Sequence, residues 1–152
     1  MRRVQKTIAE CIARAEFVSV APGDPVTVAV AGMKETGTQC ALVVENGLLV
    51  GIFTERDFLN RIAAEKRNPA LVAIREVMTP KPDALRAHDA VAYAIHQMAV
   101  RKFRNVPVVD SEGRPTSVLN VRLVMMHLLK VFAEIDQDGA DEPDDYVDLG
   151  GG

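Results

Sequence analysis

The sequence has no tryptophan, two cysteines and 5% aromatic residues over its 152 positions. So few aromatic side chains leave little surface on which bases could stack, which argues against nucleic acid as a main partner. Cys11 and Cys40 lack the spacing of a metal site and have apolar neighbours, so we expect buried free thiols in a reducing compartment. The three histidines are scattered, and no metal site is predicted.

Long apolar runs are also missing. No segment is long enough to span a bilayer, and residues 1–6 are too polar for a signal peptide, so we expect no membrane insertion and a cytoplasmic location. With 48% hydrophobic residues, the chain can still build a sizeable core. We therefore expect one ordinary domain, or two very small ones that share a core.

Charge is distributed unevenly along the chain. The formal net charge is −3, yet residues 134–152 contain eight acidic residues and no basic one. The other 13 acids face 18 basic residues, which leaves the rest of the chain at about +5. This excess is too small to indicate nucleic acid and is compatible with a small anionic ligand.

The most informative stretch is residues 51–57. An apolar strand pattern ends there and a helical pattern begins, which would bring Thr54, Asp57 and free backbone N–H groups to one point. A hydroxyl and a carboxylate in this arrangement could hold a sugar diol, with the N–H groups facing an anion. Thr54-x-x-Asp57 also matches a capping box, which uses the same two side chains only to close the start of the helix. On their own, these residues are compatible with either role.

The pattern around this stretch occurs twice. Asp24 is predicted to be the N-cap of a helix, and Asp89, 65 residues later, the N-cap of a second one. The buried-strand run at residues 106–109 likewise repeats the run at residues 41–44. The chain therefore contains two β-α-β-β-α units of about fifty residues each. Neither unit can bury both faces of its strands alone, so the two should pack into one mixed α+β core.

The repeat divides the chain into five segments. They are an N-terminal amphipathic helix (1–16), a first repeat (17–68), a linker (69–81), a second repeat (82–133) and an acidic, disordered tail (134–152). The N-terminal helix would lie on the main body or on a partner chain, because its apolar residues share one face. The tail is predicted to be disordered from its acidic composition.

Three phrases in this repeat resemble a tandem pair of CBS domains, a Bateman module. They are residues 51–57, Val77-Met78-Thr79-Pro80 and residues 103–110. The resemblance covers about residues 17–132 and implies two CBS repeats packed as an intramolecular pair. It also implies a regulatory module without catalytic activity that binds an adenosine-containing ligand, with AMP the first choice and ADP, ATP or S-adenosylmethionine the others.

The resemblance assigns roles to the two side chains of the closing phrase. In the family, the Asp of that phrase binds the ribose hydroxyls and the Thr binds the sugar or phosphate, which corresponds to Asp57 and Thr54 here. The other residues that the resemblance or their position places at the ligand are Arg56, Pro82, Arg104, Asn105, Val106 and Pro107.

Each of these residues would have a distinct part in the site. Val106 and Pro107 would line the base, and residues 81–83 would form the adjacent wall. Arg104 could reach a phosphate, whereas its neighbours Arg101 and Lys102 are more typical of a solvated turn. Arg56 lies at a helix start, where a cation is unfavourable unless an anion such as a phosphate is nearby.

The second repeat departs from the family pattern. Ser117, Asn120 and Leu123 stand where the pattern has Gly, Thr and Asp. Leucine cannot accept a hydrogen bond from a diol, so we expect one competent cleft and one degenerate cleft.

Two functions remain open at this point. The first is a nucleotide-sensing module that regulates an effector protein which the sequence does not identify, and the alternative is a ligand-free structural or oligomerisation module. In either case we expect a homodimer, because two packed repeats leave apolar helix faces uncovered. The side chains expected on those faces are Phe58, Ile62, Met125 and Leu128.

Overall fold

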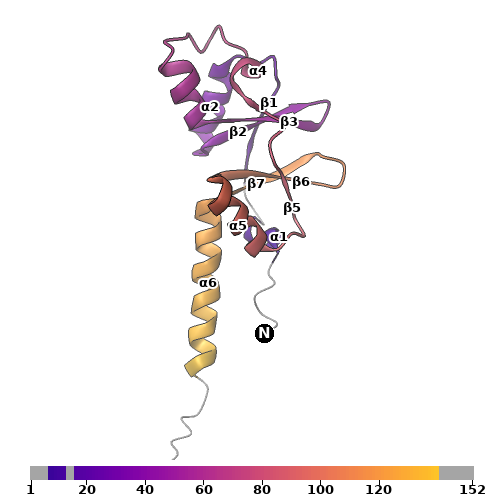
Figure 1. Ribbon diagram of the computed structural model, residues 1–152, viewed down its shortest axis with the longest axis vertical. Coiled ribbons are helices and arrows are strands. Elements are labelled where there is room, and N and C mark those ends of the chain that lie inside the picture. The colour runs from indigo at the N-terminus through magenta and orange to yellow at the C-terminus, as the bar shows by residue number, and fades with distance from the viewer. Residues whose placement is uncertain (1–6, 13–15, 141–152) are drawn as a thin grey trace, which may run out of the picture.

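The computed structural model describes residues 7–12 and 16–140. Figure 1 shows two small sheets, each with its helices on one side, and a long C-terminal helix that extends away from both. The predicted disorder beyond residue 140 and the predicted helix at residues 1–6 and 13–15 lie outside the described residues.

The first repeat contains a four-stranded sheet. Its elements are β1 (Val18–Val20), α2 (Val26–Thr36), β2 (Cys40–Glu45), β3 (Leu48–Thr54), α3 (Glu55–Phe58), the π-helical turn η1 (Leu59–Ala63), α4 (Ile74–Val77) and β4 (Thr79–Pro80). The strand order is β1-β2-β3-β4. β1 is parallel to β2, and the other pairs are antiparallel.

The second repeat contains a three-stranded sheet of the same kind. Its elements are β5 (Leu85–Arg86), α5 (Val91–Arg101), β6 (Asn105–Val109), β7 (Pro115–Asn120) and α6 (Val121–Ala140). β5 is parallel to β6, which is antiparallel to β7. The two sheets with their helices confirm the predicted mixed α+β fold of paired repeats.

The two repeats share one buried layer. Along β2, Ala41 and Val43 pack into the core of the first repeat, whereas Cys40 and Leu42 pack with Val118 of β7. This alternation follows from the two-residue period of a strand. The strands of the first repeat are therefore covered on both faces only because the second repeat is present. Burial raises the pKa of the Cys40 thiol to about 12, so this thiol stays protonated at neutral pH.

Each repeat receives a short helix from the segment that precedes the other repeat. α1 (Ile8–Cys11) comes before the first repeat, but Ile8 is fully buried in the core of the second, and its N–H donates to the Asp89 carbonyl at 2.9 Å. α4 comes before the second repeat, but Ile74 is fully buried in the core of the first, and its N–H donates to the Asp24 carbonyl at 2.9 Å. Residues 72–77, in the predicted linker, are thus partly core.

The starts of α2 and α5 differ from the prediction. The residues at their N-caps are Pro25 and Ala90, and neither helix has a side-chain cap. The Asp24 carboxylate instead accepts from the Ala21 N–H at 2.9 Å, and the Asp89 carboxylate accepts from the N–H three residues before it at 2.8 Å. Each aspartate closes the turn before its helix because the extended residue after it separates it from the first helical turn.

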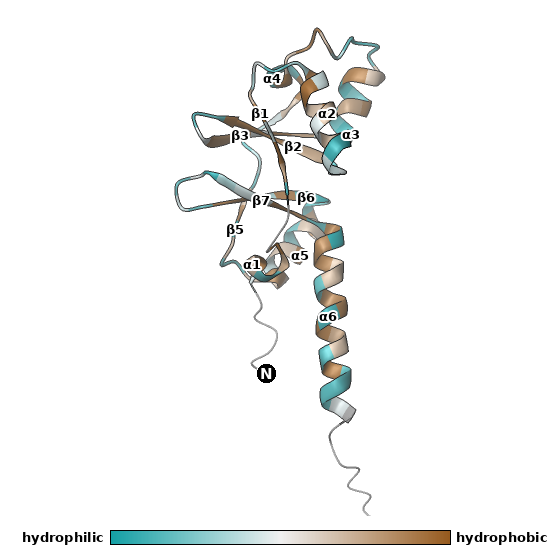
Figure 2. Cartoon of the chain, turned by 180° about the vertical axis from the view of Figure 1, so that it is seen from behind, coloured by the Kyte–Doolittle hydropathy of each residue, from teal (hydrophilic) through white to brown (hydrophobic). Residues whose placement is uncertain are grey.

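α6 is longer than the sequence analysis expects, and it leaves the body of the protein. It continues to Ala140, so the first residues of the predicted tail are helical, because the apolar period continues through Phe132 and Ile135. Figure 2 shows apolar residues along this extension.

Of the four side chains expected on uncovered helix faces, Met125 is exposed, whereas Ile62 is buried in the core of the first repeat. The other two are half-buried against their own cores.

The exchanged helices give a test of the fold. Ile8→Ala should lower the free energy of unfolding by about 2–4 kcal/mol, because it leaves a cavity in the core of the second repeat. Ile74→Ala should cost a similar amount in the first repeat. Leu71→Ala is the control, since that side chain is 81% exposed and its loss should cost less than about 0.5 kcal/mol. Denaturant unfolding measures all three, and an Ile8 variant as stable as the control would contradict this packing.

Candidate ligand-binding cleft

A cleft of about 460 Å³ lies between the two repeats. Its walls come from the end of β3 and the start of α3, from β4 and the residues after it, and from the segment that leads into β6. Seven of the eight residues predicted at the site line it: Thr54, Arg56, Asp57, Pro82, Arg104, Asn105 and Pro107. Residues from both repeats therefore meet at one place, as the sequence analysis expects.

Val106 does not line the cleft. Its side chain is buried in the core of the second repeat, because alternate residues of β6 point to opposite faces of the sheet. Asn105 and Pro107 lie on the cleft side, so the expectation that Val106 lines the site is wrong.

The cleft also contains residues that the sequence analysis did not place in it. These are Gln39, Ile52, Glu55, Thr79, Lys102 and Phe103. Lys102 lies two residues before Arg104, but a run of basic residues is typical of a solvated turn, so the sequence does not distinguish it as a cleft residue. Thr79 belongs to one of the phrases that carry the family resemblance, and its place in that phrase was the available signal.

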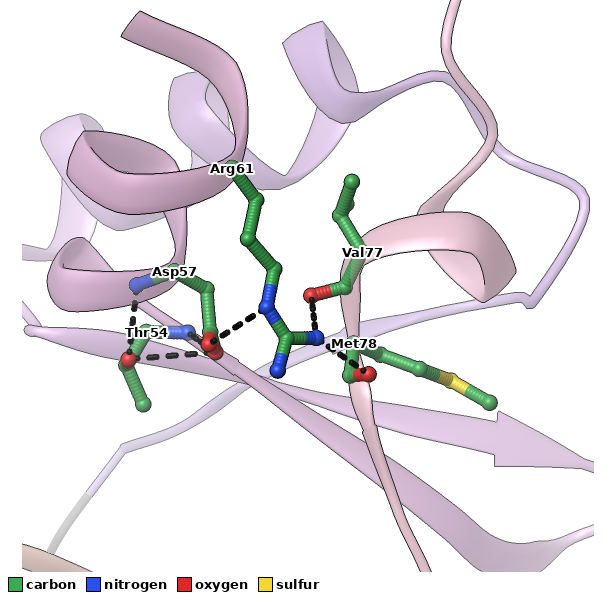
Figure 3. A network of polar contacts seen from close by, with 5 residues as sticks. All are labelled: Thr54, Asp57, Arg61, Val77 and Met78. Carbon is green, nitrogen blue, oxygen red and sulfur yellow. Dashed lines mark hydrogen bonds and ion pairs between the residues drawn. The ribbon is translucent and has the colours of Figure 1, made fainter. Parts of the chain in front are cut away.

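Thr54 and Asp57 form a complete capping box at the start of α3 (Figure 3). Asp57 Oδ2 accepts from the Thr54 N–H at 2.9 Å and from the Thr54 hydroxyl at 3.1 Å. The Asp57 N–H donates to Thr54 Oγ1 at 3.3 Å. A carboxylate has about four acceptor positions, so these contacts at Oδ2 leave capacity at Oδ1. The cap therefore fixes the orientation of a carboxylate that still lines the cleft.

Arg61 joins this carboxylate to the opposite segment of the chain. Its Nε lies 3.9 Å from Asp57 Oδ1, and its Nη1 donates to the carbonyls of Val77 at 2.9 Å and Met78 at 3.1 Å (Figure 3). Arg61 comes from η1, and the two carbonyls directly precede the cleft residue Thr79. One guanidinium therefore connects two walls of the cleft.

Gly51 allows the segment of Met78 and β4 to approach β3 closely. β3 pairs with β4 through Gly51 and Pro80, and the Met78 side chain crosses the glycine. A Cβ at Gly51 would lie 2.4 Å from the Met78 sulfur. The glycine of the closing phrase is therefore explained by this close approach.

The equivalent positions of the second repeat hold no carboxylate. The Asn120 side-chain oxygen accepts from the Leu123 N–H at 2.8 Å, and the Leu123 side chain packs against the core. Ser117 is 3% exposed, and its hydroxyl has no hydrogen-bond partner among the described residues. Asn120 thus acts as a helix cap without a neighbouring acceptor for a diol.

Within residues 7–12 and 16–140, no group of three or more His, Cys, Asp or Glu side chains could hold a metal ion. None of the helices in the described part of the chain is both long and apolar enough to cross a membrane.

The family model of the CBS domain matches the chain twice, over residues 8–64 and 74–130. Among curated proteins, CBSCBSPB1 of Arabidopsis thaliana is 35% identical over 106 residues, covering 70% of this chain and 20% of the relative. CBSCBSPB3 of the same plant is 31% identical over 102 residues, covering 67% and 18%. The chain thus spans about a fifth of the length of these relatives.

Solved structures of CBS-domain proteins share the fold. A signal-transduction protein from Burkholderia ambifaria MC40-6 superposes with a TM-score of 0.76 at 22% identity, covering 82% of this chain and 95% of the other. CBSX2 in complex with AMP gives 0.68 at 23% identity, covering 83% and 98%. The CBS domain pair of MJ0100, with 5′-methylthioadenosine and S-adenosyl-L-methionine, gives 0.72 at 18% identity, covering 81% and 99%.

The bridge made by Arg61 can be tested by substitution. Arg61→Met keeps the aliphatic stem but removes the bonds to the two carbonyls, and it should lower the free energy of unfolding by about 1 kcal/mol, since the side chain is 47% exposed. Arg67→Met is the matched control, because Arg67 makes a surface ion pair with Glu76 at 3.3 Å and its loss should cost about 0–0.5 kcal/mol. Equal losses in chemical denaturation would argue against a special role for Arg61.

Proposed function

The chain belongs to the CBS-domain family and contains two CBS repeats packed as a pair; on that premise, we propose that it is a regulatory module that binds an adenosine-containing nucleotide and thereby modulates a partner protein. The ligand would occupy the cleft between the repeats. The observation that carries the proposal is the convergence of Thr54 and Asp57 from one repeat with Arg104 and Asn105 from the other.

The chemistry of the cleft is suited to a nucleotide. Asp57 retains acceptor capacity for a ribose diol, and Arg104 can bind a phosphate through charge-assisted hydrogen bonds. Ile52, Phe103 and Pro107 form the apolar part of the cleft lining, and Phe103, which is 37% exposed, offers the most apolar surface to a base. The volume of about 460 Å³ lies within the usual range of small-molecule sites. The ligands described for CBSX2 and MJ0100 all contain adenosine, which supports the same ligand class here.

The proposed regulation depends on the fact that the walls of the cleft belong to different parts of the chain. A ligand that touches both repeats and the segment between them favours the arrangement in which these parts are held together, and it stabilises that arrangement by its differential affinity. We propose that a cytoplasmic effector protein, or another part of a longer chain, responds to this change. The module itself is assigned no catalytic step.

A ligand-free structural role is the second candidate. It is supported by the completeness of the Thr54/Asp57 capping box, which needs no ligand, and by the second repeat, where a cap exists without a carboxylate. The two candidates differ in what they require of Asp57.

The nucleotide role can be separated from capping. Asp57→Ala should lower the affinity for the bound adenosine nucleotide about thirty- to hundredfold, or about 2–3 kcal/mol, because it removes an ionised acceptor. It should also cost about 1 kcal/mol of stability through the lost cap. Asn120→Ala is the matched control, since it removes a cap at the equivalent helix, lies outside the cleft lining and should leave affinity unchanged.

Calorimetric titration with AMP, ATP and S-adenosylmethionine, together with thermal unfolding, measures both effects. Full binding by the Asp57 variant would refute its assignment. Failure of all three ligands to bind the unmodified protein would favour the structural role.

We also propose that the protein is a homodimer in which α6 packs against α6 of a second copy. The exposed side chains of Met125, Leu129, Phe132 and Ile135 are 52–65% exposed and lie along one side of the helix. An apolar stripe of this length on a projecting helix is typical of an association site. Val121 and Leu128 extend the stripe. Together with Met125, Phe132 and Ile135 they form an apolar repeat with alternating spacings of four and three residues, which is the spacing of paired helices.

The charges on α6 favour an antiparallel pair. Arg122 lies near the start of the helix and Asp136 near its end, both next to the apolar stripe. An antiparallel arrangement places each Arg122 near Asp136 of the second copy, whereas a parallel arrangement places each residue near its own counterpart. Opposite charges at these flanking positions are the stabilising choice.

The dimer makes a prediction about the stripe. Phe132→Asp should convert the dimer to a monomer at micromolar concentration, because it buries a charge without a partner in the apolar contact. Gln137→Asp, on the other side of the same helix, should leave the dimer intact. Light scattering measures the mass of each variant. A monomeric unmodified protein, or a dimeric Phe132 variant, would contradict the proposal.

A further inference from the structure

Four cationic side chains line the cleft: Arg56, Lys81, Lys102 and Arg104. None of them has an ion-pair partner among residues 7–12 and 16–140. Four like charges around one cleft repel one another unless an anion lies among them.

The acidic residues of the cleft do not supply that anion. Asp57 is engaged by Thr54 and Arg61, and Asp83 forms an ion pair with Arg101. Glu55 is the remaining acid that lines the cleft. The unpaired charges are therefore mostly positive.

Two of the four cations occupy unfavourable backbone conformations. Lys81 has φ 46° and Lys102 has φ 57°, in the left-handed region that disfavours residues with a Cβ. Lys102 is the C-cap of α5, and the equivalent C-cap of α2 is Gly37, with φ 68°. Glycine is the usual residue at this position of a helix end. The second repeat thus has a lysine at a strained position that faces the cleft, where the first has glycine.

The Asp83–Arg101 ion pair brings the two lysines to the same end of the site. Asp83 follows Lys81 by two residues, and Arg101 directly precedes Lys102. This ion pair therefore connects the segment after β4 to the end of α5. Lys81 lies next to the pair on the first segment, and Lys102 lies next to it on the second.

From these features we infer that the nucleotide carries a di- or triphosphate and that Lys81 and Lys102 hold its terminal phosphates. The inference rests on the proposed adenosine site and names its ligand class more closely. Arg56 and Arg104 serve the ribose-proximal phosphate, and the two lysines extend the cationic surface beyond it.

The charge of each possible ligand supports this choice. A single phosphate brings at most about two negative charges at neutral pH, whereas a di- or triphosphate brings about three or four, which better matches a cleft with four unpaired cations and one unpaired acid, Glu55. The sulfonium of S-adenosylmethionine adds a positive charge to a cleft that already has an excess. Lysine ammonium groups bind phosphates as point charges and need no fixed bidentate geometry.

Replacement of each lysine by glycine separates binding from folding. Lys81→Gly and Lys102→Gly remove the charge but relieve the left-handed strain, so the melting temperature should stay the same or rise by about 2–4 °C. Each variant should lose about tenfold in affinity for ATP and keep its affinity for AMP within about twofold. Lys66→Gly is the matched control, since Lys66 has φ 53° and does not line the cleft. It should gain the same stability without any change in ATP binding.

Calorimetric titration of the full chain with adenosine, AMP, ADP, ATP and S-adenosylmethionine tests the inference. Affinity should rise from AMP to ATP by about tenfold or more and should fall with added salt, because the contacts with the outer phosphates are ionic. AMP or S-adenosylmethionine binding at least as tightly as ATP would overturn this inference and leave the proposed function standing. Equal losses of AMP and ATP affinity in the lysine variants would do the same. Absence of binding by all five compounds would overturn the proposed function as well.

Discussion

The strands of each repeat are apolar on both faces, and the rest of the structure depends on covering the second face. Ala41 and Val43 are covered by the helices of their own repeat, whereas Leu42 needs the sheet of the other repeat. Separation of the repeats would return this layer to water at a cost of about 25 cal/mol for each Å² of apolar surface. Ile52 belongs to the same layer and also lines the cleft. The packing that joins the repeats therefore also sets the distance between the cleft walls.

The candidate cleft depends on interactions that are local in sequence. Asp57 is oriented by the helix cap that it forms with Thr54, and a carboxylate held in this way loses little rotamer freedom when it accepts further hydrogen bonds. Structural capping and ligand binding are thus compatible uses of one side chain. The complete capping box is the feature that would allow a binding site to persist without its ligand.

The sequence was sufficient to predict the two repeats, their mixed α+β pairing and the family, because each rests on periodic patterns and on phrases in register. The position of most candidate site residues followed from the same register. Val106 differs from the expectation because strand alternation turns its side chain toward the core, between the cleft residues Asn105 and Pro107. The sequence does not predict Lys102 in the cleft, because its left-handed backbone conformation at the end of α5 cannot be recognised from a stretch of basic residues.

The exchange of α1 and α4 has a consequence for the order in which the chain folds. A ribosome makes the N-terminal residues first, and domains generally fold as they emerge. α4 and β4 follow the other elements of the first repeat within the same stretch of chain, so the elements of that repeat are complete once Pro80 has emerged. Ile8, by contrast, is made before both repeats and is buried only after most of the second one, because the core that receives it contains Leu119 and Val124. Docking of α1 is therefore a late, long-range event that closes the second repeat once Val124 has been made.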